Sequence, residues 1–162
     1  MQLPFSEREF IEVFGSYNTA LWPAALALWV ASLAIFVLVL RGQRIDRVVS
    51  LLLAVHWAWS AILYHFVYFA PINPVAYLFG ALFLLEALLF GWAGLKQEPI
   101  RYVYERTTMH MIGVALAVYA LSYPLFTIAF VQPYPFTPTF GVPCPTTLFT
   151  VCLLYTSDAA DE

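Results

Sequence analysis

Long uncharged apolar runs dominate the pattern of hydrophobic and polar positions along this chain. None of them alternates apolar and polar positions as the strands of a membrane barrel do. A helix over residues 20–40 would be about 31 Å long, which matches a hydrocarbon core of roughly 30 Å. The pattern predicts an all-α protein, a polytopic transmembrane helical bundle with four full spans at residues 20–40, 48–70, 75–95 and 107–131.

A fifth apolar run, residues 146–155, is too short to cross a bilayer and predicts an incomplete fifth span. It is followed by "TSDAADE", which holds three carboxylates. Residues 156–162 resemble the translated adapter sequence that ends many metagenomic fragments, so we interpret them as a non-native tail and the chain as truncated in its fifth span. A re-entrant end is the alternative interpretation.

The composition supports a membrane protein. Charged residues make up 10% of the chain, against about 25% in ordinary soluble domains. Apolar residues reach 62%, and the mean hydropathy is +0.80. The lipid bilayer is therefore the first predicted partner, and the few basic residues form no patch suited to nucleic acid.

The basic residues predict an orientation. Six of the seven lie in loops 41–47 and 96–106, whereas the "PINP" turn and the loop before the fifth run hold none. Lys and Arg remain on the cytoplasmic side of membrane proteins. We therefore expect both basic loops in the cytoplasm and the N-terminus outside.

Residues 1–19 lack the basic start of a secretory signal. Ser6 followed by Glu9 fits a capping box, and apolar residues gather on one side of the following turns. These features predict an amphipathic surface helix outside the membrane that orients the first span. A lid over an outward-facing site is the alternative.

Small residues recur at spacings typical of helix faces that meet inside membranes. The predicted interior stripes are Ala24, Ala27, Ala31 and Ala34; Ala54, Ala58 and Ala61; Gly80, Ala87, Gly91 and Gly94; and Gly113, Ala117 and Ala120. The "PINP" turn predicts that the second and third spans form an antiparallel hairpin, and Pro124 predicts a kink in the fourth.

Two histidines share the second span. His65 extends the stripe of Ala61, so we expect it inside the bundle, lining an outward-facing pocket with Tyr64 and Asn73. His56 lies nine positions earlier and is turned about 180° from His65. The two cannot bind one metal or haem from this helix, and both are alternatively neutral packing residues.

Glu86 is the sharpest anomaly, because it lies about ten residues from each end of the third span. An unpaired ionised carboxylate at that depth costs several kcal/mol, so the group should be protonated, paired or beside water. Its depth allows a bond to His56 across the hairpin, with Ser32 or Tyr119 as alternative partners. Intramembrane ionisable groups often mark ion pathways, so Glu86 is the first candidate for function.

Other candidates are weaker. Cys144 lies in the predicted outer loop as a free thiol, a link to a partner chain or a small loop residue, and Cys152 is badly placed to pair with it. Met109, His110 and Met111 offer soft donors for copper, but the favoured interpretation is that they pack in the core. No catalytic, phosphate-binding or zinc motif occurs, so we predict no cofactor and no resident metal, and an enzyme is disfavoured.

Three segments carry a family resemblance: "YNTALWP", "YHFVYFAPINPVAYLFGALF" and "PTFGVPCPTTLFT". They resemble a bacterial polytopic family, the domain of unknown function 6064. The resemblance implies a multi-span protein of a bacterial inner membrane that continues for about two more helices. It implies no activity.

The sequence therefore favours an accessory or structural subunit of the membrane, acting with a membrane-protein partner or a second copy. The alternative is a small transporter or channel-like protein that uses Glu86 and His65. A membrane enzyme or haem protein is the second alternative.

Overall fold

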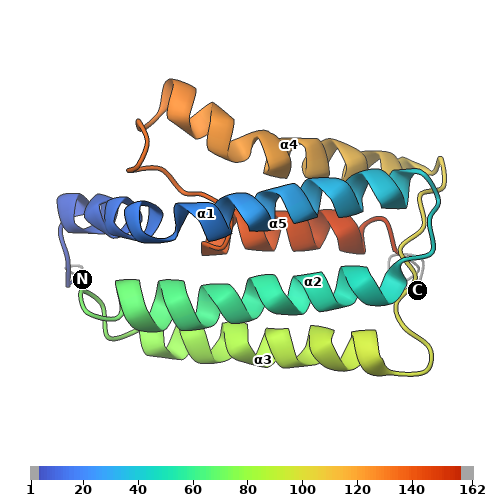
Figure 1. The fold of residues 1–162 in the computed structure, drawn as a ribbon, viewed down its shortest axis with the longest axis horizontal. Coiled ribbons are helices and arrows are strands. Elements are labelled where there is room, and N and C mark those ends of the chain that lie inside the picture. Colours follow the sequence, from blue (N-terminus) through green and yellow to red (C-terminus); the bar gives the residue numbers. More distant parts are fainter. Residues whose placement is uncertain (1–3, 158–162) are drawn as a thin grey trace.

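The computed structural model describes residues 4–157 as a bundle of helices that run along one common axis (Figure 1). Four of the helical stretches are long and apolar enough to cross a membrane, and no named strand occurs in the described part. The all-α fold class is confirmed. The elements are α1 (Glu7–Leu40), α2 (Asp46–Trp59), its π-helical continuation η1 (Ser60–Phe69), α3 (Ala76–Leu95), α4 (Thr108–Phe130) and α5 (Pro143–Leu154).

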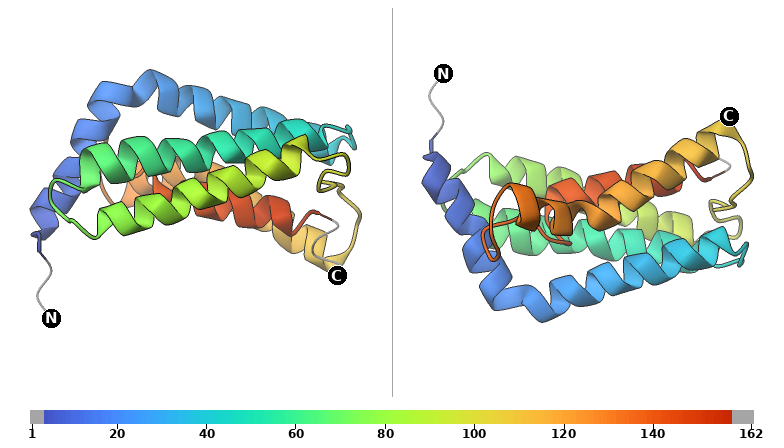
Figure 2. Two further views of the ribbon diagram at one scale, coloured as in Figure 1. Left: turned by 90° about the horizontal axis from the view of Figure 1, so that it is seen from below. Right: turned by 90° about the horizontal axis from the view of Figure 1, so that it is seen from above.

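Helix α1 joins the predicted surface segment and the predicted first span in one continuous helix. The capping box is confirmed: the Ser6 hydroxyl accepts from Glu9 N at 3.3 Å, and the Glu9 carboxylate accepts from Ser6 N at 2.7 Å. Pro23 lies inside the helix, where it removes one backbone donor. The first turns of α1 run at an angle to the rest of the helix (Figure 2).

The predicted hairpin is confirmed, because α3 packs along the length of α2 and η1 (Figures 1 and 2). Asn73 holds the turn, since its side-chain oxygen accepts from Val75 N at 3.2 Å. Glycines let the two backbones approach: a methyl group at Gly94 would lie 3.1 Å from Leu51 Cγ, and one at Gly80 would overlap the Phe66 ring. The apolar pattern of the span gives no sign of the π-helical winding of η1.

Helix α5 begins at Pro143, three residues before the predicted fifth run. Proline is favoured in the first turn of a helix, because a backbone N–H would have no partner within the helix there. The helix can therefore begin at this proline and not after it. Its 12 residues make it shorter than the four spanning stretches, and it packs mainly against α4. Thr156 and Ser157 of the predicted tail are buried, and residues 158–162 lie outside the described part.

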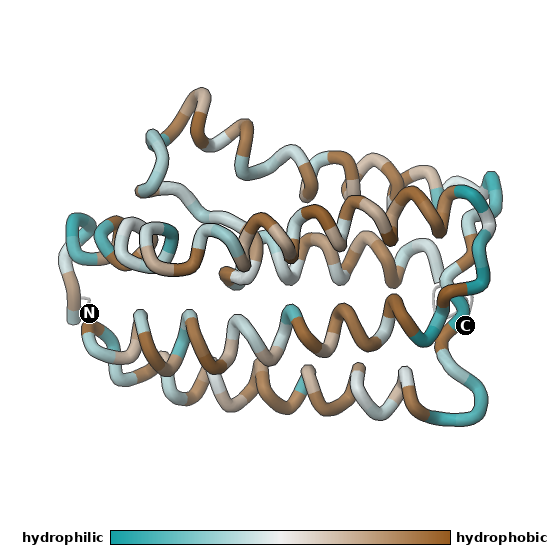
Figure 3. Tube along the Cα trace, in the orientation of Figure 1, coloured by the Kyte–Doolittle hydropathy of each residue, from teal (hydrophilic) through white to brown (hydrophobic). Residues whose placement is uncertain are grey.

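The connections gather at the two ends of the bundle. Residues 41–45 and 96–107, which hold most of the basic residues, lie at one end, and the turns at 70–75 and 131–142 lie at the other (Figure 1). Hydrophilic colour marks the loops and the start of α1, and the helices between are mainly hydrophobic (Figure 3).

The predicted small-residue stripe of α1 is wrong. Ala27 and Ala34 are exposed, and the buried face one position on carries Leu28, Ser32 and Ile35. Helix α1 packs less extensively on its neighbours than α3 does on α2, so larger side chains fill the wider gaps. The stripes of α3 and α4 do face the interior: Gly80, Ala87 and Gly94, and Gly113, Ala117 and Ala120, are buried.

Candidate functional site

His56 joins α2 to α1. Its Nδ1 donates to Leu52 O at 2.9 Å, and its Nε2 lies 3.1 Å from the Ser32 hydroxyl. The predicted bond to Glu86 is wrong, because both ring nitrogens are already used. Helix α3 packs on the other side of α2, where its Gly91 lies against Ala54. Ala54 is two positions from His56, which places it about 200° round α2 from that histidine.

Glu86 lies midway along α3 and is partly exposed. The described residues offer it neither a hydrogen bond nor an ion pair. Of its two alternative predicted partners, Ser32 bonds His56, and Tyr119 on α4 is 47% exposed. The carboxyl group is therefore left without a partner at the middle of a helix of spanning length.

His65 lies inside the bundle, 5% exposed, as the stripe of Ala61 predicts. Its ring centroid is 4.8 Å from Phe83 on α3, and neither ring nitrogen has a partner within residues 4–157. Of the residues expected to line a pocket with it, Tyr64 packs among aromatic rings, and the Asn73 side chain accepts from Val75 N in the turn. His65 is enclosed on the α3 side of the bundle.

The remaining sequence candidates do not form one cluster. Cys144 is exposed in the first turn of α5, and Cys152 is buried; both are free thiols. Met109 and Met111 are 48% and 53% exposed, whereas His110 is buried, so the three do not converge on one ion. Over the described chain, no group of three or more His, Cys, Asp or Glu side chains is placed to hold a metal.

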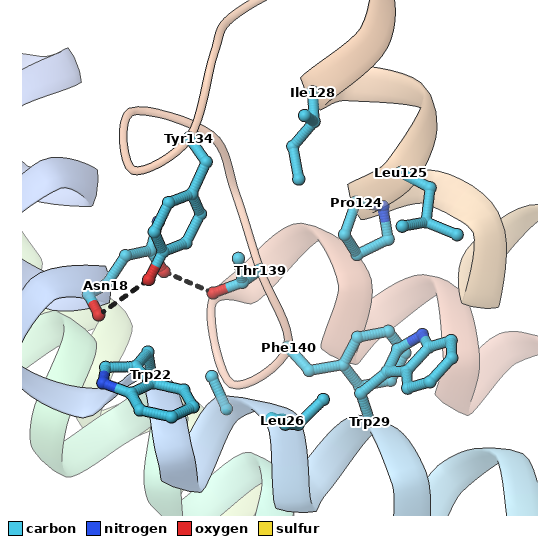
Figure 4. Close-up of a pocket in the computed structure, with 11 residues that line it drawn as sticks. Asn18, Trp22, Leu26, Trp29, Pro124, Leu125, Ile128, Tyr134, Thr139 and Phe140 are labelled. Carbon is cyan, nitrogen blue, oxygen red and sulfur yellow. Dashed lines mark hydrogen bonds between the residues drawn. The ribbon is translucent and has the colours of Figure 1, made fainter.

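The structure shows a cavity that the sequence did not predict. It has a volume of about 280 Å³ and lies between α1, α4 and the proline-rich loop 131–142 (Figure 4). Helix α4, with Pro124 inside it, diverges from α1 toward its C-terminal end (Figure 1). The lining is mainly apolar and consists of Asn18, Trp22, Ala25, Leu26, Trp29, Pro124, Leu125, Ile128, Tyr134, Thr139 and Phe140.

Asn18 pins the proline-rich loop to α1 at one edge of this cavity. Its side-chain nitrogen donates to Pro135 O at 2.5 Å and to Thr137 O at 2.7 Å, and its side-chain oxygen accepts from the Thr139 hydroxyl. Tyr134 donates to Asn18 O at 3.3 Å (Figure 4). The asparagine is 1% exposed, and every polar atom of its side chain is used. The sequence signal for this contact was the asparagine of "YNTALWP", a polar residue at the start of an apolar helix.

Tyr17 ties the same loop to α2. Its hydroxyl donates to Phe140 O at 3.1 Å and accepts from Trp59 Nε1 at 2.7 Å. The loop fits because Gly141 has a φ of +91° and passes against these two side chains. Three segments distant in the sequence thus meet in one buried polar junction.

Gly141→Ala should destabilise this junction more than a left-handed backbone alone explains. A methyl group there would lie 2.6 Å from Trp59 Cδ1 and overlap the Tyr17 hydroxyl, whereas one at Gly42, with a φ of +69°, meets nothing within 4 Å. Gly42→Ala should cost about 1 kcal/mol of unfolding free energy through its backbone conformation. Gly141→Ala should cost about 1 to 3 kcal/mol more through overpacking. Denaturant titration in detergent, followed by circular dichroism, compares the two, and equal losses would contradict the packing described for Gly141.

The bond between His56 and Ser32 should appear as a coupling energy between α2 and α1. His56→Leu removes one partner and should cost about 1 to 3 kcal/mol. With Ser32→Ala added, the double variant should lose less than the sum of the two single losses, by about 0.5 to 1.5 kcal/mol. The same unfolding measurement gives all three values. Strictly additive losses would show that the two side chains do not interact.

Comparisons with known proteins agree with the resemblance seen in the sequence. No curated protein and no solved structure matches the chain. Neither comparison therefore brings a ligand, a reaction or a partner to the residues described above. One family matches residues 7–160, nearly the whole chain, and the chain belongs to it: the family of unknown function DUF6064.

Proposed function

We propose that this chain is a multi-pass integral membrane protein that acts as an accessory or structural subunit of a membrane assembly. Its four spanning stretches present large apolar side chains outward, among them Leu78, Leu88 and Phe130, which are 61%, 65% and 76% exposed. A bilayer or neighbouring helices would cover such surfaces, which water disfavours.

The observation that carries this proposal is that buried polar side chains form hydrogen bonds between helices. His56 bonds Ser32 between α2 and α1, and Trp57 Nε1 donates to the Thr150 hydroxyl at 2.9 Å between α2 and α5. Trp29 Nε1 donates to Leu121 O at 2.8 Å between α1 and α4. Bonds of this kind hold membrane helices together. These polar groups thus join helices, and the cavity between α1 and α4 is lined mostly by apolar side chains.

The transporter alternative rests on His65, whose ring nitrogens lack partners in the part of the chain described here. Transport requires polar groups that share a path, but Phe83 lies against His65, and Glu86 is on the partly exposed surface of α3. Neither residue lines the cavity beside α1. For the haem alternative, His56 and His65 diverge, and His110 lies at the opposite end of the bundle from His65, next to the basic connection.

An accessory subunit should co-purify with a defined membrane protein at a fixed ratio from its native membranes. In vesicles, the purified chain should pass protons no faster than empty vesicles, measured with an entrapped pH dye. Glu86→Gln should leave that baseline unchanged. Proton flux well above the baseline, lost in Glu86→Gln, would establish the transporter alternative, and a Soret absorption band would establish the haem alternative.

We also propose that the end of the bundle with the basic loops faces the cytoplasm. Single cysteines should test this in a chain with both native cysteines replaced by serine. Pro74→Cys and Pro133→Cys, at exposed positions of the opposite end, should react with a membrane-impermeant maleimide in intact cells. Gln43→Cys, equally exposed but beside Arg41 and Arg44, should react only after the cells are opened. The reverse labelling pattern would reverse the orientation.

A further inference from the structure

Helix α3 exposes a regular seam of large apolar side chains. Their spacing alternates between four and three residues, which is the heptad pattern by which helices pack side by side. The helix packs against α2 with its opposite, glycine-rich face, so the seam points away from the described bundle. The seam consists of Leu78, Leu82, Leu85, Leu89 and Trp92, exposed by 61%, 53%, 54%, 49% and 65%.

A leucine seam alone does not indicate a partner in a membrane, because lipid tails are as apolar as leucine. Glu86 supplies the second observation. It directly follows the seam residue Leu85, in the flanking position where charged residues of coiled coils choose the partner helix. It lies about 15 Å from either end of α3 by the rise per residue. An unpartnered carboxyl group at that depth is costly in lipid, and a hydrogen-bond donor on an adjacent helix would remove the cost.

The charges of this chain identify the kind of helix that fits. In a parallel pair of α3 helices, the flanking position of one helix faces the other flank of its partner, which here carries Ala81 and Leu88. Neither side chain is a donor. All seven Lys and Arg residues lie outside the middle of the spans, so a second copy brings no cation to the depth of Glu86. Residues 4–157 of either copy therefore supply no cation at this depth.

We propose that the α3 seam docks a transmembrane helix of a different protein, which carries an arginine or lysine near its centre that pairs with Glu86. This inference rests on the proposed accessory function and names the chemistry of the partner. The leucines and Trp92 provide the packing surface, and the carboxyl group selects the partner. Arginine suits the role best, because its planar guanidinium can donate two parallel bonds to one carboxylate.

The test uses the full chain in lipid vesicles and two synthetic transmembrane peptides of leucine and alanine, one with a central arginine and one with a central leucine. Energy transfer from the tryptophans of the chain to a dye on the peptide reports binding. The arginine peptide should bind the wild-type chain about three- to thirtyfold more tightly than it binds Glu86→Leu. The leucine peptide should not distinguish the two. Glu86→Gln, which keeps the shape of the side chain, should give an intermediate affinity and replaces Glu86→Leu if the latter fails to fold.

A matched control moves the carboxyl group to another exposed helix. Val118, midway along α4, is 56% exposed, so the double variant Glu86→Leu/Val118→Glu keeps one intramembrane carboxyl group and changes only its place. This variant should not recover the affinity for the arginine peptide. If it does, any carboxyl group in lipid suffices and the α3 site is refuted.

Two other outcomes would overturn the proposal. Equal binding of the arginine peptide to the wild type and to Glu86→Leu would refute it, and so would self-association of the chain that depends on Glu86, because the occupant would then be a second copy. The vesicle assay is independent of the native partner. Loss of the peptide effect with intact co-purification refutes only the α3 site, whereas failure to co-purify with any membrane protein refutes the accessory function.

Discussion

Helices in a bilayer gain little from burying leucine against leucine, because the lipid they leave is equally apolar. In the membrane setting that we propose, the bundle therefore depends on two kinds of contact that lipid does not offer: close approach of backbones and hydrogen bonds between buried polar side chains. The α2–α3 hairpin uses the first, with Gly94 against the residues around Leu51. Helix α1 uses the second, through Ser32 and Trp29.

The two kinds of contact divide the bundle. Where glycines allow, α3 lies close along α2, and few polar groups are needed between them. Where the side chains are large, as on α1, indole and imidazole groups reach across the wider gaps to a hydroxyl or a backbone carbonyl. The proline-rich loop follows the second pattern. Its backbone makes few hydrogen bonds within the loop, and its carbonyl groups accept from the side chains of Asn18 and Tyr17. The cavity beside α4 lies next to this loop, at the end where α4 diverges from α1.

The fold class and the hairpin were predictable because they follow from run length, charge and turn residues, which are local properties. The partners of the polar side chains were not. A depth within one turn of His56 made Glu86 a plausible partner, but depth fixes only one coordinate, and the direction in which His56 points depends on how α1 packs against α2. The alanine stripe of α1 misled for the same reason: small residues indicate close packing only where a neighbouring helix approaches. The junction at Gly141 joins three segments that are distant in the sequence, so no local sequence pattern predicts it.

The contrast between His56 and Glu86 bears on how the chain is used. Both are ionisable groups in the middle of spanning helices, and the cost of leaving either one unpaired in lipid is similar in kind. The chain meets that cost for His56 within its own bundle, with both ring nitrogens bonded. It does not do so for Glu86 within residues 4–157, although most neighbouring positions of α3 carry leucine. A carboxyl group that makes no hydrogen bond or ion pair within residues 4–157 and is costly in lipid is best explained by a contact that the bundle itself does not contain. We therefore place the functional contact of Glu86 on the outer face of α3, away from the interior where the sequence first placed it.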